Sequence, residues 1–179
     1  LMIIGAPIAV SLGIATLTTM WFTTNIGMTS IATACFSGLD SFPLMAIPFF
    51  ILAGNLMKSG GISRRILDFA DALVGFISGA TGMVTVVASM FFAALSGSSP
   101  ATVTSIGSIT IPRMKEEGYD PAYATAIAAA AGTIGVMIPP SILFVIYGVS
   151  AQCSISDLFL AGIIPGILIG IALMCVNYY

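Results

Sequence analysis

Two polar breaks interrupt the apolar stretches of this sequence, and their residue types can supply oxygen ligands. The first break is Ser-Gly-Ser-Ser-Pro at residues 96–100, which lies inside 41 residues, 72–112, that contain no charged side chain. The second is "GTIGVMIPPS" at residues 132–141. Hydroxyl and carbonyl oxygens suit a hard cation such as sodium. The positive amino end of a half-helix suits an anion.

The composition places these breaks in a membrane. Of the 179 residues, 58% are hydrophobic and 7% are charged, and the mean hydropathy is +1.11. A soluble domain carries roughly a quarter charged residues, and a charge-free apolar run of about 18 residues or more predicts a membrane span. Four of the five long charge-free runs exceed that length: 1–39, 41–57, 72–112, 121–156 and 158–179. We expect an all-α polytopic membrane protein that is embedded in the lipid bilayer.

The sequence lacks the residues that several classes of protein function require. The chain has no histidine, which removes a Ser–His dyad, a histidine metal ligand and a histidine proton relay. An intramembrane aspartyl protease needs two acids within spans, whereas every acid here is expected in a loop or a surface helix. Five Lys and Arg in all give no basic stripe for nucleic acid. Three distant cysteines match no metal or redox spacing. We therefore expect neither an enzyme nor a nucleic-acid partner.

The first third of the chain predicts two spans and an interfacial helix. Spans are expected at 2–22 and 43–57, with a loop or short surface helix at 23–42 between them. Residues 61–77 place apolar side chains at helical spacing and charged ones on the other side. An amphipathic helix of this kind lies in the membrane interface. A solvated helix between two spans is the alternative.

The segment around the first break predicts a re-entrant hairpin. Its apolar arms, 82–95 and 101–112, each reach only ~20 Å at 1.5 Å per residue, which is short of the ~30 Å hydrocarbon core. The positive-inside rule places both flanks in the cytoplasm, so the segment enters and returns on one side, and the amino end of the chain is inside. All five basic residues flank it: Lys58, Arg64, Arg65, Arg113 and Lys115.

The second break predicts a discontinuous span. Two adjacent prolines remove two backbone donors and clash with the preceding turn, so residues 121–132 and 141–150 are expected to form half-helices, followed by a span at 158–178. Unpaired peptide groups in hydrocarbon cost several kcal/mol each unless protein or a water-filled cavity satisfies them. We expect the two breaks to meet and form one oxygen-rich site. Close helix packing and a simple proline kink are the alternatives.

The sequence resembles a known family in three stretches. These are "GLDSFPLMAIPFFILAGNLMKSGGISRRILDFADALVG", "ASMFFAALSGSSPATVTSIGSITIPRMKEEGYDPAYATA" and "AAAGTIGVMIPPSILFVIYGVSAQCSISDLFLAGIIPGI". They are similar to the large membrane (M) subunit of tripartite ATP-independent periplasmic (TRAP) transporters. The Ser-Gly-Ser-Ser tip with "IPRMKEEGYD", and "TIG" followed by "IPPSI", are specific in combination.

The resemblance implies a sodium-coupled importer of an organic acid in the bacterial inner membrane. It implies the first inverted repeat of an elevator-type ion-transporter fold, with a second repeat beyond residue 179 of what is expected to be a longer chain. Implied partners are a small four-helix membrane subunit, a periplasmic substrate-binding protein and a carboxylate such as a sialic acid or a C4-dicarboxylate. The implied divisions are scaffold helices (1–60), an arm helix (61–79), the re-entrant hairpin (80–118), a discontinuous helix (119–152) and a following span (153–179).

The resemblance also implies a residue set for each ligand. Sodium ligands are expected, mostly through backbone carbonyls, at Ser96, Gly97, Ser98, Ser99, Gly132, Thr133, Gly135 and Val136. Substrate contacts are expected at Ser99, Ala101, Thr102, Pro139 and Ser141. Two other classes stay open: a binding-protein-independent sodium/dicarboxylate symporter of the same superfamily, and a non-transporting assembly subunit.

Overall fold

The computed structural model describes residues 5–23, 28–77 and 79–178, and every regular element within them is a helix. The all-α prediction is therefore confirmed for this part of the chain. The elements are α1 (Ile8–Thr23), α2 (Met28–Leu39), α3 (Phe42–Ser59), α4 (Ile62–Val74), α5 (Ala80–Ser96), α6 (Ser99–Glu116), α7 (Pro121–Thr133), the 3-10 helix η2 (Ile134–Val136), α8 (Ile142–Ala151) and α9 (Ile155–Tyr178).

The chain divides into two compact units, residues 1–41 and 42–179, each of which is described by itself. The first unit contains α1 and α2. The sequence left a loop and a short surface helix open for residues 23–42. The structure shows a short helix, α2, in the described part of this range. The expected first span at 2–22 is helical from Ile8, and its first residues lie outside the described ones.

Helix α9 is the one described helix that is long and apolar enough to cross a membrane by itself. Its 24 residues span about 36 Å, and only 17% of its apolar window is buried in the isolated chain. Large apolar side chains such as Leu160, Ile164 and Val176 are exposed along it. By length and composition, α2 and α3 meet the same criterion only when their residues are counted together. Helices α1, α5, α7 with η2, and α8 are apolar but shorter.

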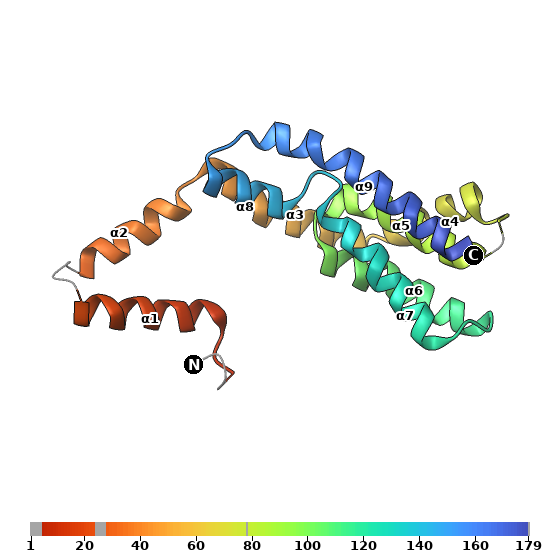
Figure 1. The fold of residues 1–179 in the computed structure, drawn as a ribbon, viewed down its shortest axis with the longest axis horizontal. Coiled ribbons are helices and arrows are strands. Elements are labelled where there is room, and N and C mark those ends of the chain that lie inside the picture. Colours follow the sequence, from red (N-terminus) through yellow and green to blue (C-terminus); the bar gives the residue numbers. More distant parts are fainter. Residues whose placement is uncertain (1–4, 24–27, 78, 179) are drawn as a thin grey trace. The chain divides into compact units, whose positions relative to one another are not determined.

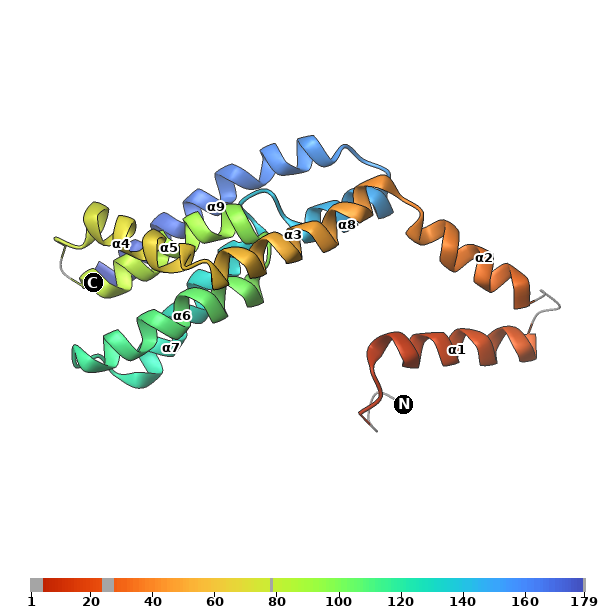
Figure 2. The same ribbon diagram turned by 180° about the vertical axis from the view of Figure 1, so that it is seen from behind.

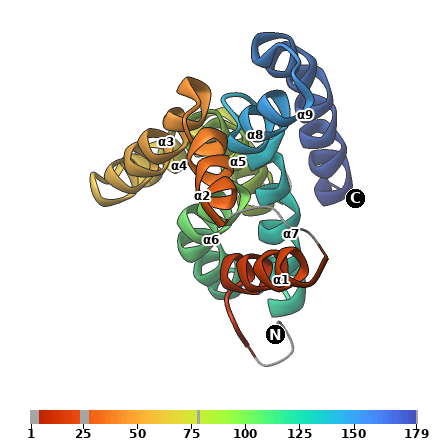
Figure 3. The ribbon, with the colours of Figure 1, turned by 90° about the vertical axis from the view of Figure 1, so that its left-hand side faces the viewer.

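The second unit is organised around the hairpin of α5 and α6. Helix α7 lies along α6, as Figures 1 and 2 both show, and α4, α7 and α9 all contact α5. Helix α8 lies between α3 and α9, which occupy opposite sides of it in Figure 3. One buried cluster joins α4 to the hairpin: Leu67, Ala70, Val84, Val87, Ala88, Phe92 and Ile106. A second joins the hairpin to α7 and η2: Val86, Ala93, Met114, Ala124, Ile127, Ala131 and Ile134.

Helix α4 has the predicted amphipathic pattern. Ser63, Leu67 and Ala70 are buried at helical spacing, and the exposed Phe69 still packs edge-to-face on Phe91 of α5, with ring centroids 5.3 Å apart. Helix α4 thus packs on the hairpin through its buried face and through Phe69. Helix α3 also belongs to the second unit, where it contacts α4, α5 and α8. Whether α3 moves with residues 1–41 as scaffold stays a prediction.

The hairpin arms are longer than the sequence predicted. Helices α5 and α6 have 17 and 18 residues, or about 25 and 27 Å, instead of ~20 Å each. Helix α6 continues past Pro112 through the charged residues to Glu116. Pro112 removes one backbone amide donor, but the helix on either side of it stays regular. Arm length alone therefore gives weaker support for a re-entrant path than the polar tip and the flanking basic residues do.

Candidate functional site

The hairpin turns at its tip within two residues. Helix α5 ends at Ser96, and Gly97 follows in the left-handed conformation (φ 61°, ψ 16°), where its amide caps the helix by donating to the Ala93 carbonyl over 3.0 Å. Ser98 is extended (φ −139°, ψ 121°) and precedes the first residue of α6. Only a residue without Cβ adopts the conformation of Gly97 at little cost, so the tip sequence fixes the turn.

Two buried hydroxyls organise the tip from inside the hairpin. The Ser96 and Thr102 side-chain oxygens lie 3.1 Å apart in hydrogen-bond contact. The Thr102 hydroxyl also lies 2.9 Å from the Ser98 carbonyl, which accepts the Thr102 backbone amide over 3.0 Å as well. Ser96 and Thr102 are 2% and 0% exposed. The polar tip thus holds its shape through its own side chains within an apolar unit.

The second break opens the backbone between α7 and α8. After η2, the amides of Met137 and Ile138 both donate to the Ile134 carbonyl, over 2.9 and 3.1 Å. A cis peptide bond joins Pro139 to Pro140. The fully buried Ser141 then caps α8, its hydroxyl accepting from the Phe144 amide over 3.4 Å. Among the described residues, none donates a hydrogen bond to the carbonyls of residues 137–140.

The two breaks meet, as the sequence predicts. The Ile142 amide donates to the Gly97 carbonyl over 3.2 Å, and the Ser99 hydroxyl donates to the Thr133 carbonyl over 3.4 Å. The approach is close: a Cβ added at Gly97 would collide with the Pro140 carbonyl. A Cβ at Gly135 would lie 2.8 Å from the Thr102 hydroxyl and 2.9 Å from the Ser98 carbonyl.

The residues expected at the site divide into those that join the breaks and those that do not. The contacts just described involve most of the set: Ser96, Gly97, Ser98, Ser99, Thr102, Thr133 and Gly135. Ser141 sits at the start of α8 beside Ile142. Gly132 instead packs against Val103 on the α6–α7 contact, and the Thr133 hydroxyl turns back to the Ala130 carbonyl. Ala101, Val136 and Pro139 are partly buried and make no hydrogen bond between the breaks.

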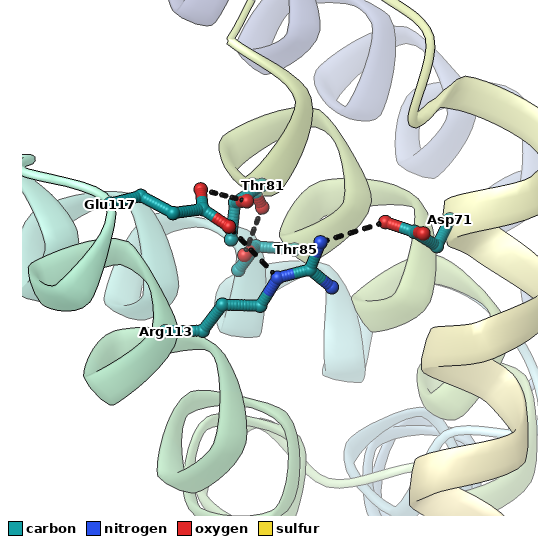
Figure 4. Close-up of polar contacts among 5 residues, drawn as sticks. All are labelled: Asp71, Thr81, Thr85, Arg113 and Glu117. Carbon is teal, nitrogen blue, oxygen red and sulfur yellow. Dashed lines mark hydrogen bonds and ion pairs between the residues drawn. The ribbon is translucent and has the colours of Figure 1, made fainter.

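A charged cluster at the other end of the hairpin was not predicted (Figure 4). Arg113 donates from Nε to Glu117 over 3.0 Å and from Nη2 to Asp71 of α4 over 3.2 Å. The second Glu117 oxygen accepts the hydroxyl of the buried Thr81, and the Thr85 hydroxyl donates to the Thr81 carbonyl over 2.7 Å. The i,i+4 spacing of Arg113 and Glu117 was visible in the sequence, whereas the link to Asp71 depends on the fold.

A second unpredicted polar group fastens three helix ends. Asn177, 9% exposed near the end of α9, accepts from the Tyr123 hydroxyl over 2.6 Å. Its amide nitrogen donates to the Gly79 carbonyl, just before α5, over 3.0 Å. Gly82 leaves the room for this side chain, because a Cβ there would overlap it. The sequence signal was an amide side chain at the end of a long apolar run.

Comparisons with known proteins identify the family of this chain. The family described as "Tripartite ATP-independent periplasmic transporter, DctM component" matches residues 1–179. The chain therefore belongs to the DctM component family of TRAP transporters, which are membrane-embedded permeases, and the resemblance noted from the sequence is confirmed.

Three relatives illustrate the range of this family. The chain is 53% identical over 178 residues to an isethionate TRAP transporter permease protein of Oleidesulfovibrio alaskensis, covering 99% of this chain and 28% of that protein. It is 44% identical over 179 residues to a C4-dicarboxylate TRAP transporter large permease protein of Vibrio cholerae, covering 99% and 40%. It is 42% identical over 179 residues to a sialic acid TRAP transporter large permease protein of the same organism, covering 100% and 42%. The chain thus spans less than half the length of each.

Proposed function

We propose that this chain forms the first half of a sodium-coupled permease that takes up an organic anion across the bacterial inner membrane. The observation that carries the proposal is the junction of the two breaks, where Ile142 of α8 bonds to Gly97 of the hairpin tip. Two interruptions of apolar helices meet there and present hydroxyls and carbonyls. In transporters, such discontinuous helices form ion and substrate sites at mid-membrane depth.

The oxygen atoms at this junction fit a sodium ion. They are neutral and hard, as such a cation prefers, and the carbonyls of residues 137–140 have no hydrogen-bond donor within the described protein. An unsatisfied carbonyl in a water-poor site costs several kcal/mol, which a bound cation would offset. We assign the ion to the hydroxyls and carbonyls of the tip and to the carbonyls from Thr133 onward.

The amino ends of α6 and α8 fit the anionic group of the substrate. Both helices begin at the junction, after Ser98 and Ser141. The first-turn amides of Ile142 and Phe144 already donate to Gly97 and Ser141, so the anion would be held by the helix ends through their dipoles and the remaining amides. Their positive ends favour a negative charge. The names of the three relatives include a sulfonate, isethionate, beside carboxylates, so we widen the expected substrate class from carboxylates to small organic acids of either kind.

The remaining features of the proposal concern the whole protein. We propose that it works with a small membrane subunit and a periplasmic binding protein, as the tripartite family description suggests. We further propose that the chain contains the first of two inverted repeats, and that its hairpin and discontinuous helix, residues 80–152, move as part of an elevator against the scaffold helices. The close packing of α5, α6, α7 and η2, which share one buried cluster, supports movement of this part as one body.

The test uses the full-length permease complex in proteoliposomes. Uptake of radiolabelled isethionate, succinate and a sialic acid is measured with a sodium or a choline gradient, and with or without the soluble binding protein. We expect uptake only when the sodium gradient and the binding protein are both present.

The other outcomes separate the rival functions. Sodium-dependent uptake that does not need the binding protein would indicate the sodium/dicarboxylate symporter instead. Equal uptake in sodium and choline would overturn the sodium assignment. A complex that binds its partners yet moves no organic acid would indicate an assembly subunit.

A further inference from the structure

The unwound stretch after η2 has helix α9 against it as well as the hairpin tip. A Cβ added at Gly162 of α9 would lie 2.5 Å from the Met137 carbonyl oxygen and would overlap the Phe144 ring. A Cβ at Gly166 would lie 2.7 Å from the Ile138 side chain and 3.5 Å from its backbone nitrogen. Both glycines are buried. The backbone of α9 therefore rests directly on the break.

The hairpin tip and α9 thus contact the break at neighbouring residues. The hairpin tip contacts it at Gly135, where the Ser98 carbonyl and the Thr102 hydroxyl leave no room for a side chain. Helix α9 contacts it two and three residues later, at Met137 and Ile138. A methyl group added at Gly162 would therefore displace the Met137 carbonyl from its present position.

We propose that Gly162 of α9 is a positioning residue for the ion, a role that rests on the proposed sodium site. Gly162 sets the position of the Met137 carbonyl and, through the short unwound backbone, of the carbonyls next to it. Coordination distances tolerate deviations of only about 0.2 Å. A methyl group 2.5 Å from a carbonyl oxygen requires a larger shift than that.

The same helix offers a matched control. Gly170 is also buried in α9, two turns further along, and the three atoms nearest to a Cβ there all belong to the side chain of Met90. That thioether is flexible and adapts to a small added volume. Gly170→Ala therefore adds the same methyl group to the same helix without touching the break.

The experiment measures sodium binding apart from transport. The purified full-length permease is unfolded thermally in mixtures of sodium and choline chloride at constant ionic strength. A ligand that binds the folded state raises the midpoint according to its concentration and affinity, while the midpoint in choline alone reports packing. We expect Gly162→Ala to raise the half-saturating sodium concentration by about tenfold, as for other residues that position metal ligands, and Gly170→Ala to leave it unchanged.

A double variant separates the carbonyl contact from the ring contact. In Gly162→Ala/Phe144→Leu the ring that the methyl would overlap is gone, whereas the Met137 carbonyl is still displaced. We expect the midpoint in choline to recover toward the wild-type value while the sodium requirement stays raised. This variant also keeps the test decisive if Gly162→Ala alone folds poorly.

The outcomes are distinguishable from a failure of the proposed function. A wild-type midpoint that does not respond to sodium would overturn the sodium site itself. A wild-type response that Gly162→Ala leaves unchanged, or that the double variant fully restores, would overturn the positioning role alone. An equal rise in the sodium requirement for Gly162→Ala and Gly170→Ala would also overturn it, because only one of these methyl groups touches the break.

Discussion

The backbone amide of Ile142, the first residue of α8, donates a hydrogen bond of 3.2 Å to the carbonyl of Gly97 at the hairpin tip. These residues are 45 positions apart, and each stands where an apolar helix is interrupted. The bond satisfies one of the amides that a helix start leaves without a partner. The hairpin tip thereby supplies a hydrogen-bond acceptor to the start of α8, and the start of α8 supplies a donor to the tip.

A substitution at Gly97 tests directly whether this junction is needed for transport. Gly97→Ala would place a Cβ in a left-handed conformation, at a cost of roughly 1–2 kcal/mol, and against the Pro140 carbonyl. We expect a lower unfolding midpoint and loss of sodium-dependent uptake. Gly118→Ala is the control, because Gly118 also has a positive φ (90°) but a Cβ there meets nothing within 4 Å. Similar uptake by the two variants would contradict a functional junction.

Gly135 tests the same junction from the side of the broken helix. Gly135→Ala would bring a methyl group 2.8 Å from the Thr102 hydroxyl and 3.0 Å from the Ser99 Cα. Overpacking of this kind costs about 1–3 kcal/mol, and we expect uptake to be lost as the tip moves away. Gly107→Ala, whose Cβ would keep ordinary contacts of 3.4 Å and more, should transport normally. The measurement is uptake per inserted protein, and a Gly135→Ala permease as active as Gly107→Ala would refute the expectation.

Thr102 tests the hydroxyl network within the tip. Thr102→Val keeps the shape of the side chain but removes the oxygen that contacts the Ser96 hydroxyl and the Ser98 carbonyl. We expect a loss of about 1 kcal/mol in the free energy of unfolding and a higher sodium concentration for half-maximal uptake.

Thr104 provides the comparison for this hydroxyl. It is exposed, and its hydroxyl donates only to the Pro100 and Ala101 carbonyls of its own helix. Thr104→Val should therefore change neither quantity. An unchanged sodium requirement in Thr102→Val would show that the buried hydroxyl serves packing alone.

We expect the two acids of the charged cluster, Asp71 and Glu117, to contribute unequally to the free energy of unfolding. The Asp71–Arg113 pair is about half exposed on both sides, so Asp71→Asn should cost at most about 1 kcal/mol. Glu117→Ala should cost about 1–3 kcal/mol, because it leaves the buried Thr81 hydroxyl without its acceptor. Thermal unfolding in detergent at low and 1 M salt measures both. Salt should reduce the Asp71 effect more than the Glu117 effect, and the reverse order would contradict this assignment.

The helices and the break were predictable because each leaves a local pattern. Spacing of apolar residues located α4 within a few residues of Ile62–Val74, and the proline pair located the unwound stretch before α8. The arm lengths were underestimated because the ends were placed where apolar character falls. Hydrogen bonding carries α6 on to Glu116 regardless of side-chain polarity.

The contacts of Arg113, Gly132 and Gly162 with residues far away in the chain leave no such pattern in the sequence. The i,i+4 pair Arg113–Glu117 can be found in the sequence, but its extension to Asp71 joins residues 42 positions apart. The family resemblance implied Gly132 as an ion ligand through its carbonyl, which stays a prediction, but its close contact with Val103 of α6 could not be found in the sequence. Gly162 was not expected at all, because a glycine in a long apolar helix does not indicate which backbone approaches it.

The junction of the breaks contains no titratable side chain: neither residues 96–105 nor residues 132–142 include an acid, a base, a cysteine or a tyrosine. Protons therefore have nothing to occupy there between about pH 5 and 8, where histidines and perturbed carboxylates exchange them. At the sodium site proposed above, protons would therefore not compete with the ion for the oxygens that these residues supply.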